Sequence, residues 1–231
     1  MRLIPFVSFK GGAGKTTTLM AVASCLVARG ERTALLEADE NAPLARWQEN
    51  ATGNATWSEL ISVLPADSER SLERSFEAAE KAGCRYALAD TAGGGSELNM
   101  MAMTNADSIV IPTGLSVLDL DDALSTLEFT DRLFGQLNQP MPARLLFTRW
   151  PQGRLKAAEG ANIAAVESLP VFKSRLTERA AFADLKATGL LHAYRDLLAD
   201  MPSRRLLARH LAGAIAEAEA VTDELLSTLP A

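Results

Sequence analysis

The sequence predicts an α/β fold, with a mainly parallel, twisted sheet that carries helices on both faces. Short apolar runs alternate along the chain with longer amphipathic patterns, which is the order of β-α-β units. The first apolar run leads into a glycine-rich loop, and two later runs end in carboxylates. At 231 residues the chain fits one large domain, and we expect residues 1–231 to form it.

The glycine-rich loop follows the first predicted strand, residues 3–9, and reads Lys10-Gly11-Gly12-Ala13-Gly14-Lys15-Thr16-Thr17. A helical pattern then runs from residue 17 to residue 29. Strand, glycine loop and helix form the context of a phosphate-binding P-loop, in which backbone N–H groups and the helix N-terminus face phosphate oxygens. We therefore expect a P-loop NTPase, in which Lys15 contacts the β and γ phosphates and Thr16 ligates Mg²⁺.

Two further strands should deliver carboxylates to the same edge of the sheet, because ligands of parallel sheets bind at the carboxyl ends of the strands. The run at residues 33–36 precedes Asp39, and the run at residues 86–89 precedes Asp90. Asp90 fits a Walker B aspartate, which holds Mg²⁺ directly or through water. Asp39 is delivered to the same edge of the sheet, although it could also be the N-cap of a helix at residues 44–50.

The remaining predicted elements follow in β-α order: a strand at 60–64, a helix at 67–82, strands at 107–113 and 143–149 separated by a helix at 118–137, a last strand at 169–172, and a helix at 203–229. Gly93, Gly94 and Gly95 separate Asp90 from a helix that Ser96 could cap. We hypothesise that this glycine run orders when a γ-phosphate is present. Pro5 is unexpected in a central strand, because it lacks an N–H group.

Composition limits the classes of protein to consider. No apolar run approaches the roughly 18 residues that span a bilayer, and the first residues lack the pattern of a signal peptide, so we expect a cytoplasmic protein. Two cysteines, Cys25 and Cys84, and two histidines suggest neither a disulfide framework nor a zinc site. Both cysteines are expected in or near the core.

The basic charge of this acidic chain is confined to one segment. The net charge is −6, yet residues 141–212 carry a net charge of +6. Cations in the first turn of the last helix oppose its dipole, so helix stability does not explain them. Contact with DNA phosphates would explain a basic set made up of Lys173, Arg175, Arg204, Arg205 and Arg209. A solvated face or intramolecular ion pairs are the alternative.

The loop K-G-G-A-G-K-T-T resembles the deviant Walker A loop of the ParA/MinD family of dimeric ATPases, in which a lysine, here Lys10, replaces the first glycine of the usual motif. The resemblance implies ATP and Mg²⁺ as cofactors, slow ATP hydrolysis that a partner or DNA stimulates, and a homodimer in which Lys10 contacts the other subunit's nucleotide. It implies catalytic roles for Lys10, Lys15 and Asp39, and metal contacts from Thr16, Asp39 and Asp90. The nucleotide-binding residues would be Gly11, Gly12, Ala13, Gly14, Lys15, Thr16, Thr17, Thr148 and Arg149, the last two at the place where relatives read adenine.

Within that family, the stretches A-D-E-N-A-P-L-A-R-W at residues 38–47 and Y-A-L-A-D-T at residues 86–91 resemble the VirC-type ATPases of DNA transfer. This resemblance implies a factor that binds DNA, largely non-specifically, and brings a DNA-processing complex to a secretion machine. Plasmid or chromosome partition is the related alternative, with partition proteins as partners. The acidic tail, residues 217–231, differs from the basic membrane-binding tail of MinD-type members, so no membrane anchor is expected.

Three classes of function therefore compete. An ATP-driven DNA-binding switch predicts ATPase activity that DNA stimulates and salt weakens. A metabolic P-loop ligase predicts stimulation by a small substrate, and a scaffold that binds ATP without hydrolysis predicts that Asp39 is dispensable.

Overall fold

The computed structural model describes residues 1–230 and contains a six-stranded sheet in which every strand pairing is parallel. The strand order is β3-β2-β4-β1-β5-β6. The strands are β1 (Arg2–Phe6), β2 (Thr33–Glu37), β3 (Ile61–Pro65), β4 (Tyr86–Asp90), β5 (Ile109–Thr113) and β6 (Ala143–Phe147). The predicted α/β fold with helices on both faces is confirmed. Because all strands share one direction, their carboxyl ends meet at one edge of the sheet.

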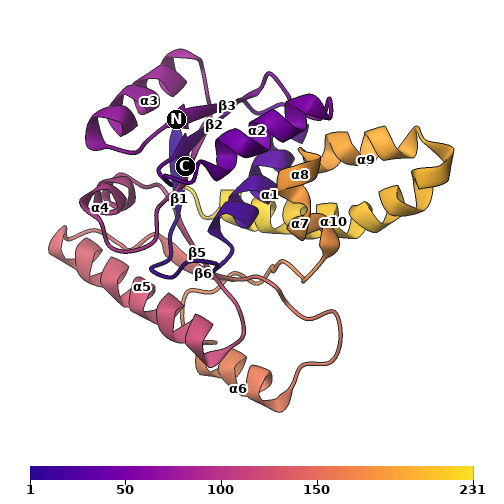
Figure 1. Ribbon diagram of the computed structural model, residues 1–231. Coiled ribbons are helices and arrows are strands. Elements are labelled where there is room, and N and C mark those ends of the chain that lie inside the picture. The colour runs from indigo at the N-terminus through magenta and orange to yellow at the C-terminus, as the bar shows by residue number, and fades with distance from the viewer. Residues whose placement is uncertain (231) are drawn as a thin grey trace.

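Helices cover both faces of this sheet (Figure 1). One face packs against α1 (Lys15–Ala28) and α2 (Pro43–Gly53), and the C-terminal helices pack mainly on these two and on one another: α7 (Ala180–Ala183), α8 (Leu185–Thr188), α9 (Leu191–Ala199) and α10 (Arg205–Ser227). The other face packs against α3 (Glu69–Lys81), α4 (Glu97–Thr104) and α5 (Val117–Gln136), with α6 (Ala157–Ala165) beyond β6. The alternation within β1 follows this division: Ile4 and Phe6 face α1, while Leu3 faces α4.

Pro5 lies in the central strand β1 at a position where its missing N–H group does not interrupt a run of backbone hydrogen bonds. The N–H groups of Leu3 and Val7 point toward β5, where they donate to the Asp107 carboxylate at 2.8 Å and to the Val110 carbonyl at 2.9 Å. By the alternation of a strand, the nitrogen of Pro5 faces the same side. β1 and β5 pair in register only at Phe6. The missing N–H group of Pro5 therefore lies where the two strands form few backbone hydrogen bonds.

The segment from Leu169 to Phe172 is not a strand, so that prediction was wrong. It forms a single bridge, Leu145 to Val171, beside β6. Two causes are visible. Pro170 has no N–H to donate, and after Phe172, which donates to the Leu145 carbonyl of β6 at 2.8 Å, the Ser174 amide donates to the Glu224 carboxylate of α10 at 2.8 Å instead of to β6.

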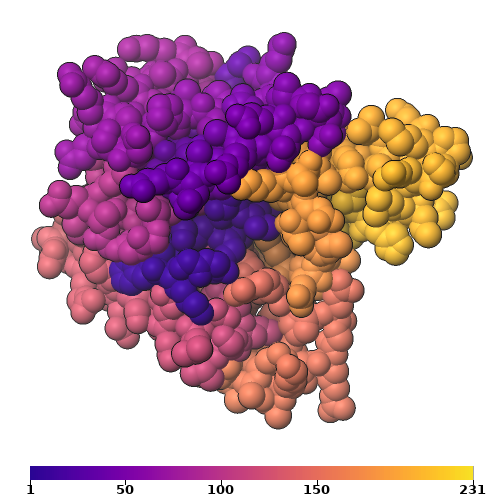
Figure 2. Space-filling model, viewed as in Figure 1, coloured from indigo at the N-terminus to yellow at the C-terminus, as the bar shows by residue number. Residues whose placement is uncertain are grey.

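The chain ends in a helical hairpin, α9 and α10, that projects away from the sheet (Figures 1 and 2). A 3-10 turn at Pro202–Arg204 connects the two helices. The predicted helix at 203–229 is confirmed with slightly narrower bounds, and the last residue of the chain lies outside the described range. No helix among residues 1–230 combines the length and the apolar character that crossing a membrane requires.

Candidate functional site

The P-loop lies at the carboxyl edge of the sheet, between β1 and α1. Gly12 and Gly14 adopt positive φ angles of 82° and 98°, a region that residues with a Cβ rarely occupy. Gly14 is the N-cap of α1 and contributes no side-chain cap, so the first N–H groups of the helix remain available to an anion. Gly11 and Gly12 are exposed, whereas Ala13 is buried beneath the loop.

Thr16 and Asp90 meet at the centre of the site. The Thr16 hydroxyl donates to Asp90 Oδ2 at 2.7 Å, while Asp90 Oδ1 is buried and has no partner among the described residues. Burial raises the pKa of the Asp90 carboxyl to about 6, and the Thr16 hydrogen bond and the Lys15 ammonium offset this only in part. A buried carboxylate oxygen without a donor, next to a threonine hydroxyl, fits a Mg²⁺ site that phosphates complete. No group of three or more His, Cys, Asp or Glu side chains within residues 1–230 could hold a metal unaided.

Asp39 stands beside this pair without capping a helix. Its Oδ1 accepts from the backbone N–H and the side-chain amide of Asn41, both at 2.9 Å. The cap of α2 comes instead from Glu37, whose carboxylate accepts from the N–H groups of Leu44 and Ala45. The alternative role for Asp39 as a helix cap is therefore wrong, and the carboxylate remains half-exposed at the edge of the site.

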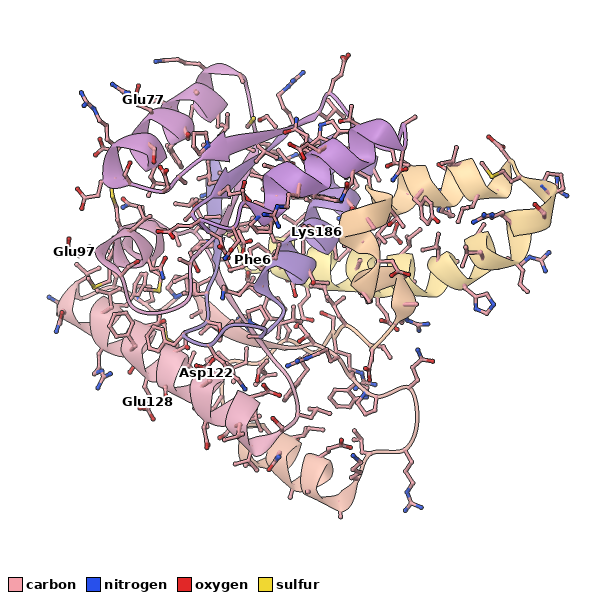
Figure 3. All side chains as sticks on the ribbon, viewed as in Figure 1. Phe6, Glu77, Glu97, Asp122, Glu128 and Lys186 are labelled. Atoms are coloured by element: carbon pink, nitrogen blue, oxygen red, sulfur yellow. The ribbon has the colours of Figure 1, made fainter. Side chains whose placement is uncertain are left out.

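Lys10 is held within its own chain by Asp119, in the first turn of α5. The Lys10 ammonium lies 3.1 Å from Asp119 Oδ1, and the Arg149 guanidinium lies 3.4 Å from Oδ2. Burial acts in the opposite direction, but hydrogen bonds from Ser116 and Lys10 hold the pKa of Asp119 below its usual range. α5 makes a second contact with the loop region, in which Asp122 accepts from the Ser8 hydroxyl at 2.8 Å. Figure 3 labels Asp122, and also Glu128, which faces outward from the same helix.

A pocket of about 250 Å³ opens beside the P-loop. Thr148 forms its floor beneath Gly14, with its hydroxyl 3.2 Å from the Ala13 carbonyl oxygen, and Arg149 stands at its wall with a positive φ of 51°. The opposite wall is the segment from Leu176 to Ala183, and the loop contributes Gly12, Gly14 and Thr17. The two positions predicted to read the base thus lie in one pocket with the P-loop.

The Glu217 carboxylate of α10 holds that wall in place. Glu217 accepts from the Thr177 N–H and hydroxyl at 2.9 and 2.8 Å, and from Arg179 Nε and Nη2 at 3.0 and 2.6 Å. Burial by itself would raise the pKa of Glu217, but the donors Arg179 and Thr177 outweigh it and lower the pKa.

The glycine run between β4 and α4 is tied down by Asn99. Its side-chain amide donates to the carbonyls of Ala92 and Gly94 at 2.8 and 2.6 Å, and its buried Oδ1 has no partner among the described residues. Ser96 accepts from the Asn99 N–H at 3.2 Å, so its predicted role as the cap of α4 is confirmed.

The five basic residues do not form one patch. Lys173 lies beside Glu224 near the C-terminal end of α10, whereas Arg204, Arg205 and Arg209 lie at its N-terminal end. A helix of 23 residues separates the two groups by roughly 30 Å. Arg175 stacks over the Trp150 ring at 4.0 Å from its centroid. Arg204, Arg205 and Arg209, at the N-terminal end of α10, are exposed and make no ion pair within the described part of the chain.

Motif reasoning missed four side chains that shape the site: Glu37, Asn99, Asp119 and Glu217. Asp119 and Glu217 bond groups far along the chain, while Glu37 and Asn99 bond nearby backbone groups, and no motif spacing marks either kind of partner. Asp119 carried one local signal, since it lies in the first turn of a helix with Ser116 as its cap.

Comparison with known proteins decides the family. The VirC1 protein family model matches residues 1–231. The virC1 protein of Rhizobium rhizogenes is 45% identical over 217 residues, which cover 94% of both chains, and that of Rhizobium radiobacter is 43% identical over 99% of both chains. The chain belongs to the VirC1 family. The ParA protein of Rhizobium radiobacter is a more distant relative of this VirC1-family chain, with 26% identity over 87% of it.

Solved structures place the VirC1-family fold among ParA- and MinD-type proteins. A putative plasmid partition protein from Borrelia burgdorferi bound to AMPPNP superposes with a TM-score of 0.68 at 15% identity, over 99% of both chains. MinD from Pyrococcus horikoshii complexed with Mg-ADP superposes with a TM-score of 0.66 at 16% identity, over 97% of both chains. The predicted ParA/MinD resemblance and the P-loop NTPase fold are confirmed.

Proposed function

We propose that this VirC1-family chain is an ATPase that dimerises on ATP, binds DNA, and assists the processing of transferred DNA and its recruitment to a secretion machine in the cytoplasm. The observation that carries the proposal is the loop itself: Lys15 and Thr16 face Asp90 on one side, while Lys10 stands exposed on the other with Asp119 as its only ion-pair partner in the described chain. Family membership and the ParA/MinD-type fold support it.

Within the site, each residue has a proposed role. The P-loop amides of Gly11 to Thr17 and the Lys15 ammonium bind phosphate oxygens. Thr16 and Asp90 would hold Mg²⁺, which supplies charge neutralisation at the phosphates. Asp39, half-exposed beside them, orients the attacking water and contributes to the metal shell. Thr148, Arg149 and the wall formed by residues 176–183 enclose the base.

The two-lysine arrangement supports the proposal of a partner subunit. Lys10 is too exposed to be a structural residue, and in a dimer it leaves Asp119 for the partner's phosphates, which carry more negative charge than one carboxylate. Dimerisation then brings two arginine-bearing hairpins together, and phosphate contacts made by two subunits act additively on DNA affinity.

Replacement of Lys10 tests the dimer. We expect Lys10→Ala to abolish ATP-dependent dimerisation, measured by size-exclusion chromatography with light scattering, and to leave nucleotide binding by the monomer within a few-fold of wild type. Lys81→Ala, which removes an exposed lysine of α3, is the control and should dimerise normally. A Lys10→Ala protein that still dimerises with ATP contradicts the proposal.

DNA binding in three nucleotide states separates the DNA switch from its rivals. Wild-type protein should bind duplex DNA with ATP and much more weakly with ADP or no nucleotide, and Arg204→Ala/Arg205→Ala should weaken the ATP-dependent binding. Arg70→Ala/Arg74→Ala on α3 makes the same change of charge at a distant exposed site. A metabolic ligase or a scaffold that does not use DNA would bind equally little in all three states.

Plasmid partition is the second candidate, because a ParA protein is among the relatives and a putative plasmid partition protein is among the structural neighbours. The same ATP-dependent DNA binding would serve it, with partition proteins in place of DNA-processing proteins as partners.

A further inference from the structure

We propose that a pocket between α7, α8, α9 and α10 binds an unpaired nucleobase, so that this chain recognises single-stranded DNA and not only duplex phosphates. The inference rests on the proposed DNA-binding function and specifies the form of DNA that is bound.

The pocket is distinct from the one beside the P-loop. It has a volume of about 300 Å³ and includes no residue of the P-loop. The segment Arg179 to Ala181 lies between the two pockets, and Arg179 lines both. A nucleotide held by the P-loop has its own pocket at residues 176–183, so the second one is available to a different ligand.

Its lining suits a flat aromatic ligand. Leu207 and Leu211 of α10 and Ala180 of α7 supply apolar contact, and two rings, Tyr194 of α9 and His210 of α10, stand at its walls. An unstacked base presents two apolar faces, which proteins cover with aromatic and aliphatic side chains. The arrangement offers both kinds of surface in one cavity.

The polar edge of a base would find uncommitted groups. The Tyr194 hydroxyl, the Asp184 carboxylate and the His210 ring make no side-chain hydrogen bond within residues 1–230, although each lines the pocket. Gln152 donates through Nε2 to the Glu178 carbonyl at 2.6 Å, which leaves its amide oxygen free to accept. Donors and acceptors around an apolar cavity are the pattern that fixes the orientation of a bound base.

The helix that lines the pocket also carries the charge that a nucleic-acid backbone requires. Leu207, His210 and Leu211 share one face of α10, whereas Arg205 and Arg209 lie on the opposite, exposed face and Arg204 lies at the start of the helix. All three arginines are exposed and without ion pairs in the described chain. Proteins hold single strands without reading their sequence by combining cations that bind the backbone with surfaces on which bases stack. A base within an intact duplex stays stacked and could not enter.

The test compares three probes of equal length: oligothymidylate, an abasic oligonucleotide with the same phosphates, and a duplex. Fluorescence anisotropy with protein and a non-hydrolysable ATP analogue gives each affinity. Wild type should bind oligothymidylate about tenfold more tightly than the abasic strand, since stacking of one base contributes roughly 1–3 kcal/mol. The abasic probe keeps the electrostatic contribution and removes the bases.

Two variants of adjacent leucines separate the pocket from simple charge. Leu207→Glu puts a carboxylate into the pocket, and Leu206→Glu makes the same change of charge at a neighbouring side chain that is 69% exposed and outside the lining. We expect Leu207→Glu to lose the preference for oligothymidylate and Leu206→Glu to weaken all three probes alike. Tyr194→Leu, which removes a ring and keeps apolar bulk, should lose the preference too and decides the matter if Leu207→Glu does not fold.

Equal binding of oligothymidylate and the abasic strand by wild type, or a preference that survives both Leu207→Glu and Tyr194→Leu, overturns the inference and leaves the proposed function intact. Failure to bind any probe, the duplex included, in the presence of the ATP analogue overturns the proposed function and the inference with it.

Discussion

At the scale of single residues, Asp90 is a carboxylate in an environment far from that of a free amino acid. It is 1% exposed, and its pKa is raised by burial to about 6 from an ordinary value of 3.8. The folded protein therefore holds the Asp90 proton more tightly than the unfolded chain does. As the pH rises from the Asp90 pKa of the unfolded chain to that of the folded protein, ionisation of Asp90 lowers the free energy of unfolding by about 3 kcal/mol in all.

We therefore expect Asp90→Asn to stabilise the nucleotide-free protein near pH 7.5 by about 1–3 kcal/mol and to have a much smaller effect near pH 4, where the wild-type carboxyl is already protonated. Urea unfolding at both pH values measures this. Asp131→Asn, an exposed aspartate of α5, should change neither value. An equal effect of Asp90→Asn at the two pH values would show that the burial of charge is not the cause.

The residues predicted from the sequence are those whose chemistry is carried by local spacing. Thr16 and Asp90 follow their strands at fixed offsets, so both were predicted, and the structure brings them to 2.7 Å. Asp119 was not predicted as a partner of Lys10, because 109 residues separate the two along the chain and neither lies in a motif with the other. Such pairs are fixed by how α5 packs against the P-loop, which no local pattern describes.

At the scale of elements, α10 acts as a support for the segment that crosses its side. Glu224 accepts from the Lys173 and Ser174 amides, and Glu217, two turns earlier, accepts from Thr177 and Arg179. The segment is thus held from two sides, because Phe172 and Leu176 also donate to the Leu145 and Phe147 carbonyls of β6 at 2.8 and 3.0 Å. The strand predicted at residues 169–172 is only a bridge, since Pro170 has no N–H to extend the ladder and the Ser174 amide donates to Glu224.

Only Glu217 holds residues that line the pocket beside the P-loop, Thr177 and Arg179, and that difference makes a prediction. Glu217→Ala should speed hydrogen exchange at residues 176–183 and weaken nucleotide binding about tenfold, because Thr177 and Arg179 lose a charged acceptor. Glu224→Ala should speed exchange only near residues 173–174 and leave nucleotide affinity near that of wild type. Hydrogen exchange read by mass spectrometry and nucleotide titration measure the two effects, and an equal loss of affinity in both variants would contradict this division.

The same contact gives a pH dependence. Hydrogen bonds lower the pKa of Glu217 in the folded protein, so its contribution to stability is complete above the unfolded pKa of 4.5 and is lost as the pH falls through the lowered value. The difference in unfolding free energy between wild type and Glu217→Ala should therefore shrink below about pH 4.

At the scale of the whole molecule, the charge is divided in a way that the sequence showed only in part. The basic charge of the sequence lies in residues 141–212, and the sequence analysis treated five of these cations as one set. Folding separates that set, because Lys173 lies near the C-terminal end of α10 while Arg204, Arg205 and Arg209 lie at its N-terminal end. The group at the α9–α10 connection, Arg204, Arg205 and Arg209, is exposed and makes no ion pair in the described chain.

That group makes the last prediction. Each phosphate neutralised by a cation contributes about −0.9 to the slope of log affinity against log salt. If Arg204, Arg205 and Arg209 each contact a phosphate in the ATP-bound state, their joint replacement by Ala should reduce the slope by roughly 3 for each protomer.

The matched control is Arg70→Ala/Arg74→Ala/Lys81→Ala on α3, with the same loss of three cations from an element that lies on the other face of the sheet. Unequal slopes place the DNA at the hairpin, because a change in overall charge alone would affect both variants in the same way. Equal slopes in the two triple variants would mean that the hairpin arginines contribute only to the long-range field and do not touch the DNA.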